Sequence, residues 1–185
     1  MRLDDETYEF IKGEVVDLFV RNDVKCIPIS GFELAVKMGI VLMPYSALAG
    51  EKLLTAHKVS PDGFYMEPGN GKEYIWYNDK MGYDRCNMTI LHEIGHAVLG
   101  HSDDTDSEVA ESEAAFFAKY AAAPPPLIHK IQPSSAKEIA DVFCISYEAA
   151  CYAWDYYCKW LKFHIAYGCF TTYEQQLNKQ YGITA

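Results

Sequence analysis

The most distinctive chemistry of this 185-residue chain lies in one short segment. His92, Glu93 and His96 form the pattern H-E-x-x-H within a stretch of helical periodicity. A spacing of four residues places both imidazoles on one helix face, about one turn apart, so both can bind one metal ion. Glu93 lies about 100° around the helix from His92, where it can take a proton from an attacking water. The segment therefore predicts a metal-dependent hydrolase with Glu93 as the catalytic base.

A catalytic zinc site of this kind needs a third protein ligand and an open fourth position. A second helix is predicted after the polar loop at 101–106, and it should run back antiparallel to the first. His96 lies about 5 Å before the end of its helix and Glu111 a similar distance inside the next, so the two are nearly level. Glu111 and Glu113 point about 200° apart, so only one of them can face the metal. Helical geometry alone does not choose between these two acids.

Other polar residues surround this predicted site in the sequence. His101 follows Gly100, which should end the helix, and it is out of angular register with His96. We therefore expect His101 to lie in the loop or to contact a ligand rather than the metal. A run of acids places negative potential near the site and favours retention of a cation: Asp103, Asp104, Asp106, Glu108, Glu111 and Glu113. Four side chains are equivalent candidates for stabilising an oxyanion: Tyr83, Arg85, His101 and Tyr120.

Periodicity and capping residues predict the elements that position these side chains. In chain order they are a helix over 4–20, a helix from Ser30 to Gly39, strands over 40–43, 63–66 and 74–77, a helix from Thr89 to Leu99, a helix from Ser107 to the prolines at 124–126, and further helices over 135–143 and after Ser146. The expected fold is α+β, with helices on a small, mostly antiparallel sheet. We expect the strand over 74–77 to accept an extended substrate by strand addition.

Composition limits the classes of function that fit. The chain is 50% hydrophobic with a formal net charge of −10, and all of that net charge lies in residues 1–128. A general basic surface for nucleic acid is therefore not expected. The first residues show no signal peptide, and no apolar stretch approaches a membrane span, so we expect a cytoplasmic protein without a membrane partner. The six cysteines contain no C-x-x-C pair, and Cys144, Cys151 and Cys158 are predicted to share one buried helical face.

The sequence resembles the ImmA/IrrE family of zinc metallopeptidases over most of its length. The segments that carry the resemblance are 27–40, 62–64, 75–78, the active helix 89–96 with Leu99, Gly100 and His101, then 111–118 with Pro124, and 139–150. In the family, the first acid of the pattern E-x-E-A binds the metal, which favours Glu111 over Glu113. The sequence departs from the family's pattern at Asn87 and Met88, at 121–123, and at Ala153 and Trp154, none of which touches the metal chemistry.

The resemblance implies a zincin-like domain over 1–128 with a helical C-terminal subdomain, 129–185, packed on it. It implies Zn²⁺ held by His92, His96 and Glu111, with Glu93 as the catalytic residue. Members of the family are typically encoded beside a helix-turn-helix repressor on phages and mobile elements, and they cleave that repressor. The implied function is a narrow-specificity endopeptidase that regulates transcription. An alternative is a non-proteolytic module that contains zinc and sequesters a repressor or another partner protein through its aromatic C-terminal third.

Overall fold

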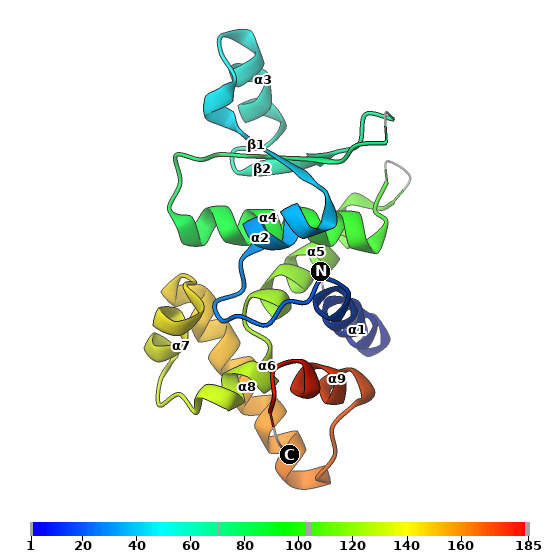
Figure 1. The fold of residues 1–185 in the computed structure, drawn as a ribbon, viewed down its shortest axis with the longest axis vertical. Coiled ribbons are helices and arrows are strands. Elements are labelled where there is room, and N and C mark those ends of the chain that lie inside the picture. The colour runs from blue at the N-terminus through cyan, green and yellow to red at the C-terminus, as the bar shows by residue number, and fades with distance from the viewer. Residues whose placement is uncertain (1, 70, 103–104, 184–185) are drawn as a thin grey trace. The chain divides into compact units, whose positions relative to one another are not determined.

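The computed structural model describes residues 2–69, 71–102 and 105–183 (Figure 1). Asn70, between the strands predicted over 63–66 and 74–77, and Asp103 and Asp104 of the predicted acidic run, lie outside the described residues. The chain forms two compact units, one centred on Ser30–Ala118 and the other made of Leu3–Ile29 and Lys119–Ala185. This division differs from a boundary at residue 128. The N-terminal helix α1 (Asp5–Arg21) groups with the C-terminal helices because it packs on α9 (Thr172–Gln180).

The first unit contains a three-stranded sheet. Its strands β1 (Val41–Pro44), β2 (Gly63–Met66) and β3 (Tyr74–Tyr77) are ordered β1-β3-β2. The β1–β3 pairing is parallel and the β2–β3 pairing is antiparallel, so the sheet is mixed rather than mostly antiparallel. The expectation that an extended substrate pairs with residues 74–77 is wrong, because β3 is the central strand and both of its edges are already paired. Strands β1 and β2 are the edge strands of the sheet.

Helix α4 (Tyr83–Leu99) carries the H-E-x-x-H pattern and lies against β2 and β3. In Figure 1, α4 and α2 (Gly31–Met38) lie on one side of the sheet, and α3 (Glu51–Val59) lies on the other, following the short η1 (Tyr45–Ala47). The close approach of α4 requires Gly63. A Cβ there would come within 2.6 Å of both the Thr89 side chain and the Trp76 carbonyl oxygen. Glycine thus lets the edge strand pass directly beside α4.

The boundaries of the two site helices differ in part from those expected. Helix α4 begins at Tyr83, well before Thr89. Its N-cap residue is Gly82, which has no side chain to accept a capping hydrogen bond, so the sequence carries no capping signal there. Its end at Leu99 is as predicted, with Gly100 in the left-handed conformation. Helix α5 (Ser107–Ala122) is capped by Asp106 rather than Ser107, since Asp106 Oδ1 accepts from two backbone N–H groups of the first turn, at 3.0 and 3.2 Å.

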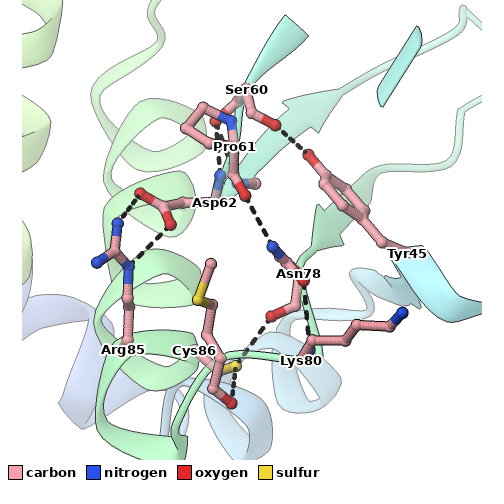
Figure 2. A network of polar contacts seen from close by, with 10 residues as sticks. Tyr45, Ser60, Pro61, Asp62, Asn78, Lys80, Arg85 and Cys86 are labelled. Carbon is pink, nitrogen blue, oxygen red and sulfur yellow. Dashed lines mark hydrogen bonds and ion pairs between the residues drawn. The ribbon is translucent and has the colours of Figure 1, made fainter. Parts of the chain in front are cut away.

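A polar network fixes the start of β2 (Figure 2). Asn78, which is buried and follows β3, donates from Nδ2 to the Pro61 carbonyl oxygen at 3.0 Å. Arg85, in the first turns of α4, donates from two nitrogens to the two carboxylate oxygens of Asp62, both at 2.8 Å. The loop that enters β2 is therefore tied both to the end of β3 and to α4. This arrangement holds the edge strand in place beside the histidines.

The second unit is helical. Besides α1 and α9 it contains α6 (Pro125–Ile131), α7 (Ala136–Phe143) and α8 (Tyr147–Tyr167). Helix α8 packs on α6 and α7, and α9 packs on α1 and α6. Fully buried side chains such as Phe19, Leu127 and Leu177 form its core. Among the helices that the structure describes, none has the length and apolar character needed to cross a membrane.

The expectation for the three evenly spaced cysteines was wrong. Cys144 is exposed in a left-handed conformation directly after α7, so it does not lie on the helix that carries the other two. Cys151 and Cys158 are half-buried on α8. The spacing of seven residues therefore crosses a helix boundary and does not mark one buried helical face.

Candidate metal centre

The structure brings His92, His96 and Glu111 together within the first unit. The two Nε2 atoms of the histidines lie 3.1 Å apart on α4. Glu111, on α5, places one carboxylate oxygen 3.2 Å from His92 Nε2 and the other 3.5 Å from His96 Nε2. One ligand atom from each residue lies within 4.8 Å of the others, close enough for a single metal ion to contact all three.

The close packing of α4 and α5 depends on the glycine inside the motif. A Cβ on Gly95 would lie 3.1 Å from two ring atoms of Phe117, a distance tighter than most packed side chains accept. Phe117 is fully buried, so it has little room to move away. Gly95 therefore allows α5 to approach α4 closely, and this approach helps to bring Glu111 level with the histidines.

Both histidines of the cluster are in a state suited to metal binding. Burial lowers the pKa of His92, and the nearby Glu111 carboxylate only partly opposes this effect. Burial, together with repulsion from His92, lowers the pKa of His96 to about 4. Both rings are therefore neutral near pH 7. A neutral imidazole has the free lone pair that a metal ion requires.

Glu93 is buried beside the cluster, with 7% of its surface exposed. Its Oε2 accepts a hydrogen bond from the backbone N–H of Tyr65 on β2, at 2.8 Å. Burial raises the pKa of Glu93 to about 7, and the Tyr65 hydrogen bond opposes the rise. A carboxyl group with this pKa can both accept and return a proton near neutral pH. The hydrogen bond from the Tyr65 N–H to Glu93 was not predicted, because every non-proline residue has a backbone N–H and its partner cannot be recognised from residue type.

The second acid of the α5 pair faces a different partner. Glu113 Oε2 lies 2.8 Å from His101 Nε2, and His101 Nδ1 lies 2.9 Å from His96 Nδ1. Glu111 therefore faces the histidine pair while Glu113 faces His101. This is the division of directions expected for two helical residues separated by about 200°.

The candidates for oxyanion stabilisation occupy different environments. The Tyr83 ring stacks on Phe32 with centroids 5.8 Å apart, and Arg85 is engaged with Asp62. Tyr120 is buried within the second unit. His101 contacts the predicted ligand His96 and lies where the sequence places it, just past the end of α4.

An α+β domain with an H-E-x-x-H helix and a carboxylate supplied from the next helix has the arrangement of zincin-like metallopeptidases. The model of the Peptidase_M78 family, described as the IrrE N-terminal-like domain, matches residues 35–155. The chain belongs to this family, which confirms the resemblance drawn from its sequence and supports a function of the metal-dependent peptidase type. A comparison with curated proteins finds no significant match.

Proposed function

We propose that this protein is a zinc-dependent endopeptidase of narrow specificity. The observation that carries the proposal is the cluster of His92, His96 and Glu111 beside a buried carboxyl group, Glu93. Two neutral imidazoles and one carboxylate form a donor set typical of catalytic zinc, and they leave a position for water and substrate. These residues thus fit the metal that the family implies.

His92, His96 and Glu111 would hold the zinc ion. When bound, zinc supplies a Lewis acid that polarises the scissile carbonyl and makes water acidic enough to react near neutral pH. The protein contributes the geometry of the ligands and the proton acceptor. The depressed pKa values of the histidines keep both rings neutral, so protons do not compete with the metal at pH 7.

Glu93 would move the protons of the reaction. Its Oε2 is fixed by the Tyr65 N–H, and among the described residues no donor contacts its Oε1. Oε1 is therefore available to accept a proton from the attacking water. The same carboxyl group can then deliver this proton to the leaving amine, because it lies beside the cluster with one oxygen unengaged.

The edge strand β2 suits an extended substrate. The Tyr65 N–H points away from β3 and toward Glu93, so the outer edge of β2 borders the proposed site. An extended peptide that lies along this edge would be beside both the metal and Glu93. The resemblance to the ImmA/IrrE family supports a cytoplasmic helix-turn-helix repressor as the substrate, with no direct contact to nucleic acid or membrane.

The test compares the zinc-loaded wild-type protein with Glu93→Gln. Each is incubated with a helix-turn-helix repressor, the substrate class that the family resemblance implies, and the products are followed by intact-mass spectrometry. We expect two fragments from the wild type, and much slower cleavage by the variant at equal zinc content. If both proteins instead block repressor binding to DNA without producing fragments, the chain is a sequestering module and the peptidase proposal is wrong.

A further inference from the structure

We propose that Glu113 and His101 are positioning residues that set the tautomer of His96 and thereby strengthen zinc binding. This inference rests on the proposed function and extends it to residues outside the ligand set. The three side chains form a continuous chain of hydrogen bonds from α5, through the residue after the end of α4, to the proposed ligand.

The outer link fixes the proton of His101. Glu113 Oε2 lies 2.8 Å from His101 Nε2, and an ionised carboxylate only accepts hydrogen bonds. His101 Nε2 must therefore carry the proton in this contact. In the neutral ring, Nδ1 of His101 is then left without a proton and acts as an acceptor.

The inner link transfers this constraint to His96. The two Nδ1 atoms of His96 and His101 lie 2.9 Å apart, a distance at which one must donate and the other accept. Because His101 Nδ1 is the acceptor, His96 Nδ1 carries the proton. His96 Nε2 then presents its lone pair toward His92 and Glu111, where the metal would sit. If His96 instead carried its proton on Nε2, that proton would point into the proposed metal site. The unprotonated Nδ1 atoms of His96 and His101 would then face each other with two lone pairs and no hydrogen bond.

Burial makes the constraint effective. The side chains of His101 and His96 are 7% and 16% exposed, so water cannot readily replace either partner. The left-handed Gly100 turns the chain so that the backbone N–H of His101 donates to the His96 carbonyl oxygen at 3.1 Å. This turn brings the His101 ring against the His96 ring, with centroids 5.0 Å apart. The position of the His101 ring is thus fixed by the turn at the end of α4 as well as by Glu113.

The arrangement gives separate roles to the two acids that stand two residues apart on α5. Glu111 reaches the metal-binding nitrogens directly, whereas Glu113 acts on the far nitrogen of one ligand through His101. Partners that bind the second nitrogen of a ligating histidine orient its ring and raise its basicity. Their removal typically costs about 10- to 100-fold in metal affinity.

The first test reads the tautomers directly. Long-range ¹H–¹⁵N spectra of the full chain, labelled at its histidines, distinguish a protonated Nδ1 from a protonated Nε2 both without metal and with Zn²⁺. We expect the proton of His101 on Nε2 and that of His96 on Nδ1. In Glu113→Ala, His101 should become a mixture of tautomers, whereas Glu113→Gln should keep the wild-type state because its amide oxygen still accepts. A wild-type His101 protonated at Nδ1 would overturn the inference.

The second test measures Zn²⁺ affinity by competition with a fluorescent chelator. His101→Ala and Glu113→Ala should each weaken binding by about 10- to 100-fold. Glu113→Gln and the surface control Glu51→Gln should stay close to the wild type. This pattern separates positioning from general loss of structure, since the conservative variant rescues the effect. Wild-type affinity in both alanine variants would overturn this inference alone, whereas a wild type that takes up no Zn²⁺ would overturn the proposed function as well.

Discussion

Two buried glutamates, one in each unit, show how the same side chain serves different purposes. Glu174 in the second unit is 3% exposed, and both of its carboxylate oxygens accept hydrogen bonds, from Trp160 Nε1 and from the Thr171 backbone N–H. Glu93 in the first unit is 7% exposed, and a described donor contacts only its Oε2. Glu174 also completes the capping box of α9. A carboxylate enclosed by donors stabilises a fold, whereas one with an unengaged oxygen beside a candidate metal site can carry protons.

The largest effect should come from removing proton transfer at Glu93. In Glu93→Gln the amide oxygen can still accept from Tyr65 N–H, but the side chain can no longer take a proton. We expect repressor cleavage to slow by roughly 10²- to 10⁴-fold while zinc content is unchanged. The matched control is Glu174→Gln, in which the cleavage rate per bound zinc should equal that of the wild type. Equal loss of activity in the two variants would remove the distinction drawn between these carboxylates.

The pH dependence of stability should reveal the cost of ionising Glu93. In the metal-free protein its pKa is about 7, above the ordinary value of 4.5 that it takes in the unfolded chain. The contribution of this group to the free energy of unfolding is therefore fully present below pH 4.5, and it is lost as the pH rises through 7. Glu93→Gln lacks this loss, so its advantage over the wild type should grow across that window to about 3 kcal/mol at most.

Urea unfolding of both proteins in EDTA, between pH 4 and 8, measures this difference. The low pKa values of the two histidines act in the opposite direction: stability falls as the pH drops from 6.5, the ordinary histidine value, toward about 4, where His96 becomes protonated. Both proteins contain these histidines, so the difference between them isolates Glu93. A difference in stability that does not change with pH would show that burial leaves the pKa of Glu93 unperturbed.

A smaller effect is expected at the enclosed carboxylate. Glu174→Ala removes the acceptor for Trp160 Nε1 and for the Thr171 N–H, so the free energy of unfolding should fall by about 1–3 kcal/mol. Zinc content of the folded protein should not change, because the proposed ligands belong to the first unit. Thermal unfolding and elemental analysis of the same samples measure both quantities. Loss of zinc without loss of stability would contradict a purely structural role.

The site could be predicted from local spacing to a large extent. The i, i+4 rule places His92 and His96 on one face, and the left-handed Gly100 ends their helix as expected. Glu111 and Glu113 face different partners in the structure, as expected for helical residues about 200° apart. The hydrogen bond from Tyr65 to Glu93 could not be predicted, because it joins a backbone donor to a residue distant in sequence.

Long-range pairing and weak caps limited prediction of the fold. That β3 is central depends on which strands pair, and no local pattern in 74–77 reveals this. Helices α3 and α4 begin after Gly50 and Gly82, which offer no capping side chain, so the start of α4 was misplaced and α3 was missed. Helix α6 was also missed, although its proline at the first position is a recognised signal of a helix start.

The proposed metal site is tested most directly by the zinc content of the protein purified without added metal or chelator. Elemental analysis should find about one zinc per wild-type chain, and Glu111→Ala should lose it. In a second measurement, with zinc supplied in excess, Glu113→Ala should still bind the metal, because Glu113 acts through His101 and is not itself a proposed ligand. If the wild type contains no metal and takes none up on titration, the cluster of His92, His96 and Glu111 is not a metal site and the proposed peptidase mechanism is wrong.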